Sequence, residues 1–144
     1  MPDRDCRILP QISAFRRISR VDNVGNRLNT EHDMLVLNED DTRKALPWPE
    51  LLEAIAAMFV AGCVTPVRHH HEVDVPGEAG ATMLLMPAWV PGEHMGVKIL
   101  NLFPDNHLRA LPTIIGTYLL SSARTGDMLA MIEGGELTAR RTAA

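Results

Sequence analysis

Apolar and polar positions along the chain predict a short strand, two helices, a run of strands and a last helix. Residues 34–37 form an apolar run typical of a buried strand. Asn38 comes next and is followed by three acidic residues. This is the pattern of an N-cap and a first helical turn whose negative charges suit the helix dipole. Pro49 begins a second helix and Gly62 is placed to end it. Its apolar residues recur at helical spacing and predict one buried face made of Leu51, Leu52, Ile55, Met58 and Phe59.

After this helix the pattern changes to strands, which are expected over 67–75, 82–89, 96–103, 113–121 and 128–132. A helical pattern returns from Glu136 onward. This order differs from the regular strand–helix alternation of a doubly wound sheet. It predicts an α+β fold in which a mixed or antiparallel sheet packs against helices.

The two ends of the chain differ from its middle. Residues 1–33 are rich in arginine and in helix- and strand-breaking asparagines, so we expect a disordered or artefactual extension, with Met34 as an alternative start. The final run, residues 136–144, has no Gly, Asn or Pro to close its helix. We therefore expect one domain over 34–144 that is incomplete at its C-terminal end.

Composition narrows the class of partner. The net charge of −4 argues against nucleic acid, because phosphate binding requires an excess of basic residues. No apolar run approaches the ~20 residues of a membrane span, so no membrane partner is expected. Two cysteines are too few for a disulfide framework, and no signal peptide is visible, so we expect a cytoplasmic protein.

Three cationic residues are candidates for chemistry. Lys98 stands between apolar neighbours in an expected strand, so it lies either on the solvent face or desolvated in a cleft, where it could donate a proton. Arg68 and Arg141 are either surface charges or a guanidinium fork for a carboxylate.

Two further patterns bear on cofactors. His69, His70 and His71 suggest a metal site, but only the first and third share a face of a strand and no acid lies on that face, so we expect no metal. The sequence contains no Gly-x-Gly-x-x-Gly and no P-loop, so it carries no nucleotide-binding motif of its own.

Several motifs in order resemble the ornithine cyclodeaminase/mu-crystallin family. The resemblance covers about residues 34–144 and is carried by Leu-Leu-Met-Pro-Ala (84–88), Met-Gly-Val-Lys-Ile-Leu-Asn-Leu-Phe-Pro (95–104), Leu-Pro-Thr-Ile-Ile-Gly (111–116), Thr-Gly-Asp-Met-Leu-Ala-Met-Ile-Glu-Gly (125–134) and Leu-Thr-Ala-Arg-Arg-Thr-Ala-Ala (137–144). It implies the first, substrate-binding and dimerisation domain of a two-domain enzyme whose second domain is a Rossmann domain for NAD or NADP.

The resemblance also assigns roles to particular residues. It implies that Arg68, Lys98 and Arg141 bind the substrate carboxylate, that Lys98 is catalytic at the imine nitrogen, and that Thr113 meets the nicotinamide carboxamide. It suggests, further, that Met86 and Asn101 line the pocket. Leu84 stands where cyclodeaminases carry an acid, which favours a reductase-type ancestor over ornithine deamination.

Two functional hypotheses follow from the resemblance. In the first, the chain is a truncated family member whose intact enzyme transfers hydride between NAD(P) and an amino or imino acid, as a ketimine reductase or ornithine cyclodeaminase. In the second, it is a non-catalytic remnant that folds, dimerises or binds a small carboxylate. Both expect a homodimer and no nucleotide bound by the chain alone. The first adds a separately encoded nucleotide-binding half as a partner.

Overall fold

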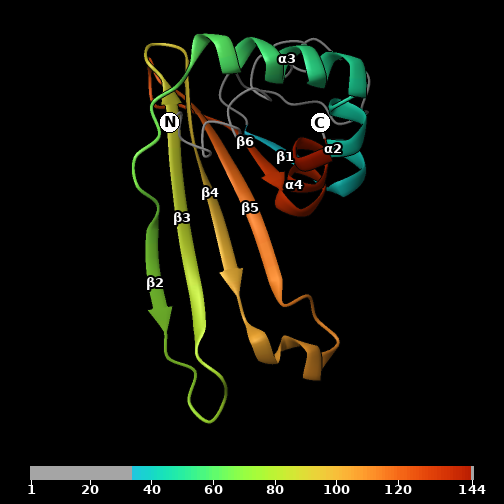
Figure 1. The fold of residues 1–144 in the computed structure, drawn as a ribbon, viewed down its shortest axis with the longest axis vertical. Helices are drawn as coiled ribbons and strands as arrows, with labels where there is room; N and C mark the ends of the chain where they lie inside the picture. The colour runs from blue at the N-terminus through green and yellow to red at the C-terminus, as the bar shows by residue number, and fades with distance from the viewer. Residues whose placement is uncertain (1–33, 144) are drawn as a thin grey trace.

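The computed structural model describes residues 34–143, so the expectation for residues 1–33 lies outside the described part of the chain. One sheet and a small group of helices make up this part (Figure 1). The elements in chain order are β1 (Leu35–Leu37), α2 (Glu39–Ala45), α3 (Trp48–Ala61), β2 (His69–Val73), β3 (Ala81–Val90), β4 (His94–Leu102), the 3-10 helix η2 (Pro104–Arg109), β5 (Ile114–Ser122), β6 (Met128–Glu133) and α4 (Gly134–Ala143).

The sheet has six strands in the order β1-β6-β5-β4-β3-β2. Strands β2 to β6 form a continuous antiparallel meander, in which each strand pairs with the next one along the chain. Only β1 pairs in parallel, with β6. A mixed sheet with helices packed against it confirms the expected α+β class, because strands joined by short connections pair as antiparallel neighbours.

One face of the sheet carries the core. Side chains alternate between faces along a strand, and the strand residues of the main buried cluster keep one parity in each strand. The helices cover this face, and in Figure 1 they gather beside the β1, β6 and β5 side of the sheet. The buried cluster consists of Leu46, Leu51, Ile55, Met86, Ala88, Tyr118, Leu120, Ala130, Ile132 and Leu137.

The opposite face is apolar but none of its residues belongs to that buried cluster. Val36 is 60% exposed, Ile115 is 45% exposed and Leu129 is 36% exposed. Leu119 and Met131 on the same face are half-buried. The described part of the chain therefore presents an uncovered apolar sheet surface, which we call the open face.

The helical expectations are mostly confirmed. The Asn38 side chain accepts a hydrogen bond from the Asp41 amide (3.0 Å), and the Gly62 N–H bonds the Met58 carbonyl at the end of α3 (2.7 Å). The expected apolar face of α3 is wrong in two places, because Leu52 and Phe59 are 47% and 59% exposed. Only Leu51 and Ile55 of that set are buried. The buried side of α3 is therefore narrower than the helical spacing of its apolar residues predicted.

Candidate functional site

Lys98 is buried at the centre of the covered face. It lies in the middle of β4, paired with Met86 on β3 and Tyr118 on β5, and only 3% of its surface is exposed. The solvent-face alternative for Lys98 is therefore wrong. Among the described residues, no carboxylate forms a salt bridge with it. Burial first, and the nearby charge of Arg141 second, lower the pKa of Lys98 to about 8.

Helix α4 supplies the groups around the Lys98 ammonium. The Nζ atom donates a hydrogen bond to the Thr138 hydroxyl at 2.6 Å. Arg141, three residues further along, is close enough for its positive charge to act on Lys98. Positions three apart lie on the same side of a helix, so one face of α4 brings a hydroxyl and a guanidinium to one lysine. Sequence reasoning singled out Arg141 and missed Thr138, although this spacing relates the two.

Two sets of contacts fix α4 in place. At its start, the Glu133 carboxylate accepts hydrogen bonds from the amides of Gly135 (2.6 Å) and Glu136 (2.8 Å), which satisfies donors that the first helical turn leaves open. Further along, Arg140 donates to the Leu46 carbonyl (2.7 Å) and lies 5.0 Å from the centre of the Trp48 ring. These contacts tie α4 to the connection after α2 and to the first residue of α3.

A charge cluster reinforces the same position of α4. Glu136 accepts hydrogen bonds from Arg140 at 2.7 Å and from Arg43 of α2 at 3.2 Å. The hydrogen bond from Arg140 and then that from Arg43 hold the pKa of Glu136 below its ordinary value. Arg140 and Glu136 are only 13% and 14% exposed, so this pair is better shielded from solvent than a typical surface salt bridge.

Arg68 lies immediately before the edge strand β2. It directly precedes His69, which pairs with Leu85, and the next residue of β3 is Met86, the partner of Lys98. Alternation from His69 puts Arg68 on the same face as Lys98. Two strand spacings, about 10 Å, separate the backbones of β2 and β4. The register of β2, extended back by one residue, predicts Arg68 on the same side of the sheet as Lys98, and Arg68 itself is exposed.

Thr113 and Asn101 lie apart from this group. The Thr113 carbonyl accepts a hydrogen bond from the Phe103 amide at 2.9 Å, and Phe103 is five residues beyond Lys98. That is roughly 17 Å along a strand, so the structure does not bring Thr113 to Lys98. Asn101 lies three residues after Lys98 in β4 and therefore on the opposite face, which makes the expectation that it lines the same pocket wrong. Met86 does neighbour Lys98.

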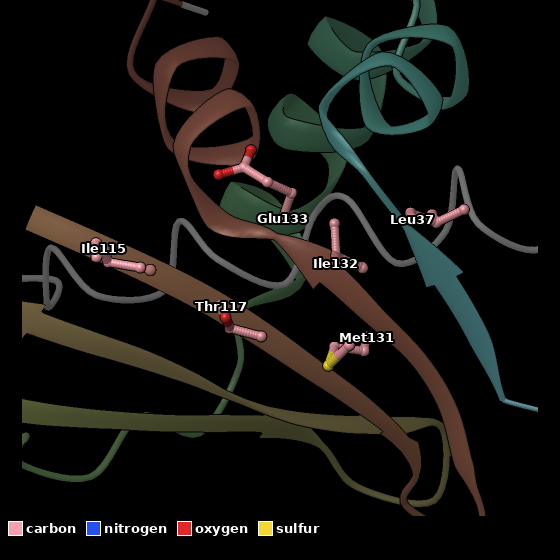
Figure 2. Close-up of a pocket in the computed structure, with 7 residues that line it drawn as sticks. Leu37, Ile115, Thr117, Met131, Ile132 and Glu133 are labelled. Carbon is pink, nitrogen blue, oxygen red and sulfur yellow. The ribbon is translucent and has the colours of Figure 1, made fainter. Parts of the chain in front are cut away.

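A separate hollow of about 270 Å³ is lined by residues of β1, β5 and β6 (Figure 2). In Figure 2 the Glu133 side chain turns toward the first turn of α4, consistent with the two amide hydrogen bonds that its carboxylate accepts. Among the described residues, no cationic side chain lines the hollow, so it lacks the charge that favours a carboxylate. Its lining residues are Leu37, Ile115, Gly116, Thr117, Met131, Ile132 and Glu133.

The histidine triplet forms strand β2 and does not build a metal site with other described residues. The rings of His69 and His71 meet edge to face, with centroids 6.3 Å apart. Within residues 34–143, no group of three or more His, Cys, Asp or Glu side chains could hold a metal ion. In the same range, none of the helices has the length and apolar character needed to cross a membrane.

The arrangement suits recognition of a small anion. Two cationic side chains, Lys98 and Arg141, converge from a strand and a helix, and a third, Arg68, immediately precedes the edge strand β2. Lys98 in this setting can donate a proton near neutral pH, because its pKa lies close to that range. Cationic donors in a desolvated setting bind a carboxylate more strongly than they would in water.

Comparisons with known proteins identify a family and related folds. The model of the ornithine cyclodeaminase/mu-crystallin family matches residues 32–144. Delta(1)-pyrroline-2-carboxylate reductase 1 of Burkholderia multivorans is 38% identical over 114 residues, which are 76% of this chain and 35% of that protein.

Two solved structures share the fold. A lysine cyclodeaminase, described with L-lysine, L-ornithine and L-2,4-diaminobutyric acid, is 28% identical with a TM-score of 0.61 over 76% of this chain and 35% of its own. Delta(1)-pyrroline-2-carboxylate reductase of Thermococcus litoralis, solved with NADH and L-proline, is 29% identical with a TM-score of 0.61 over 76% of this chain and 34% of its own. The chain thus spans about a third of the length of these relatives.

Proposed function

The chain belongs to the ornithine cyclodeaminase/mu-crystallin family, and we propose that it is the part of a ketimine reductase or cyclodeaminase that binds the carboxylate of an amino or imino acid. One observation carries the proposal. Lys98 is a buried cation next to a second cation, Arg141, and no described carboxylate forms a salt bridge with it. Burying a charge without an opposite charge beside it costs stability even when a hydroxyl accepts a hydrogen bond from it, so an anionic ligand is the best explanation of the arrangement.

In this proposal Arg68, Lys98 and Arg141 hold the carboxylate, and Lys98 also handles the proton at the imine nitrogen. A protonated imine accepts hydride more readily than a neutral one, so a cationic acid at that nitrogen promotes reduction. NAD or NADP supplies the hydride. The chain has no glycine-rich phosphate loop, so we place the nucleotide in another part of the enzyme and keep Thr113 as its candidate contact on this chain.

The relatives support the choice of substrate class. Two of them are named for reduction of a cyclic imine carboxylate, and a third is a cyclodeaminase described with diamino acids. All these compounds carry a carboxylate beside a nitrogen-bearing carbon. Leu84, at the position where the family's cyclodeaminases carry an acid, favours the reductase type for this chain.

Binding of a carboxylate should depend on pH. The charged and titratable neighbours of Lys98 are Arg141, which stays protonated, and Tyr118, whose pKa burial raises and which therefore stays neutral. Lys98 has its pKa lowered to about 8, so it loses its charge as pH rises through that value. We expect affinity for L-proline, measured by calorimetry, to be constant below pH 7 and to fall above pH 8 by no more than about tenfold per pH unit. Affinity that is flat from pH 6 to pH 10 would remove Lys98 from the site.

We also propose that a second copy of the chain covers the open face, giving a homodimer. An exposed apolar sheet face that includes Val36, Ile115 and Leu129 is a candidate interface. Replacing Ile115, on the open face, with glutamate should convert the dimer to a monomer in light scattering. Val60→Glu is the matched control, because Val60 is 91% exposed on α3 and lies outside the open face. A wild-type protein that is monomeric at high concentration would contradict this proposal.

A further inference from the structure

We propose that Thr138 is a positioning residue for Lys98, whose hydroxyl holds the Nζ atom in place while the lysine binds the carboxylate and moves a proton. The inference depends on the proposed function for the identity of the substrate. The contact itself, and the geometry that defines it, belong to the described fold.

The direction of the hydrogen bonds defines the role of Thr138. Its hydroxyl accepts from Lys98 Nζ at 2.6 Å and donates to the carbonyl of Gly134, one turn earlier in α4. A hydroxyl has a single proton, and Thr138 uses it in the hydrogen bond that it donates to the Gly134 carbonyl. Only the lone pairs of the oxygen remain for Lys98, so the lysine must be the donor in this contact.

The bond to Gly134 alone would mean little, because threonines inside helices often donate to the carbonyl four residues back. What distinguishes Thr138 is its second partner, which comes from β4, 40 residues away in the sequence. A helix threonine that served only local structure would have no reason to meet a lysine that is 3% exposed.

The same contact persists when Lys98 changes charge. A protonated amine has three N–H groups, and one of them goes to Thr138. The other two are left for a carboxylate or an imine nitrogen. A neutral amine keeps two N–H groups and can still donate to the hydroxyl. A proton can therefore leave Lys98 for a substrate without the Nζ atom changing position.

Thr138 also links the two cations of the site. It shares one side of α4 with Arg141, and the contacts of Arg140 and Glu136 tie this helix to α2 and to Leu46. The positions of Lys98 and Arg141 are consequently set by the same helix. A shift of α4 would move both groups together.

The sequence makes a direct test simple, because the chain has only two lysines, Lys44 and Lys98. Growth with ¹³Cε-labelled lysine gives one resonance for each, and exposed Lys44 serves as the internal reference. In the wild-type chain, a held Lys98 should show two separate Hε resonances, whereas Lys44 shows one averaged signal. Averaged Hε signals for wild-type Lys98 would overturn the proposal without any variant.

Two substitutions complete the test. Thr138→Val keeps the shape and removes the acceptor, so the charged form of Lys98 loses a stabilising hydrogen bond. We expect Lys98 to titrate at a lower pH than in wild type and its Hε signals to merge, with an unchanged circular dichroism spectrum. Thr138→Ser keeps the hydroxyl and should restore both properties. If Lys98 in Thr138→Val titrates at the same pH as in wild type and keeps two separate Hε resonances, the hydroxyl does not hold the lysine.

Addition of L-proline separates this inference from the proposed function. If the chain binds the carboxylate, the Lys98 resonance moves and that of Lys44 does not. If neither moves, the proposed function fails, whereas the effect of Thr138→Val on Lys98 in the ligand-free chain still decides the positioning role.

Discussion

Replacing Lys98 with alanine should lower kcat for imine reduction by about 10²-fold or more, because the reaction loses the group that protonates the imine nitrogen. KM should rise as well, since Lys98 also holds the carboxylate. The assay follows NADH oxidation with Δ1-pyrroline-2-carboxylate. It uses residues 34–144 joined to the remaining two thirds of the Burkholderia multivorans reductase, a relative that is 38% identical.

Lys44→Ala is the matched control for this experiment. Lys44 is the other lysine of the chain and is exposed on α2, so its loss should leave kcat within about twofold. An active fusion in which Lys98→Ala has wild-type kcat would exclude Lys98 from proton transfer. A lower affinity with unchanged kcat would limit Lys98 to binding the carboxylate.

Replacing Gly134 with alanine should destabilise the fold strongly. A Cβ atom at Gly134 would lie 2.9 Å from the Gly116 Cα atom and closer still to the Gly116 carbonyl group. The obstacle is the backbone of β5, which cannot rotate away as a side chain could. Overpacking of this kind costs about 1–3 kcal/mol, and we expect the upper end of that range. For a domain of this size each kcal/mol lowers Tm by about 4–8 °C, which thermal unfolding measures directly.

Gly80→Ala is the control for Gly134→Ala. A Cβ atom at Gly80 would meet nothing within 4 Å, and Gly80 is exposed between β2 and β3. Its Tm should stay within about 2 °C of wild type, because alanine there creates no clash. Equal Tm values for the two variants would contradict the close approach of α4 to β5. A lower Tm in Gly134→Ala alone would support the close approach. Because α4 carries Thr138, we also expect the Lys98 NMR resonances to change in Gly134→Ala.

Local signals in the sequence account for most elements of the fold. The Asn38 cap, the Gly62 terminus and the alternation of each strand act through neighbours along the chain, so they can be recognised without the tertiary structure. The strand boundaries differ by one or two residues from those expected, as for β2, which covers His69–Val73 instead of 67–75. The motifs that resemble the family identified Lys98 and Arg141 as functional candidates.

The α3 helix shows where local signals fail. Leu52 and Phe59 match the helical period as well as Leu51 and Ile55 do, yet they are exposed. The period says which residues share a side of a helix, but the width of the buried stripe depends on what packs against it. That partner is a sheet whose strands come from later in the chain.

The sequence by itself determined the order of the elements, the α+β class and the identity of the cations, because each depends on residue type and short-range spacing. Only the tertiary structure decided that Lys98 is buried, that Thr138 meets it, and that α4 approaches β5 too closely for any residue but glycine at 134. These facts arise from contacts between segments about 20 to 40 residues apart, and such contacts are set by strand register and helix docking. Burial in turn lowers the pKa of Lys98 to about 8, and no local pattern encodes that change.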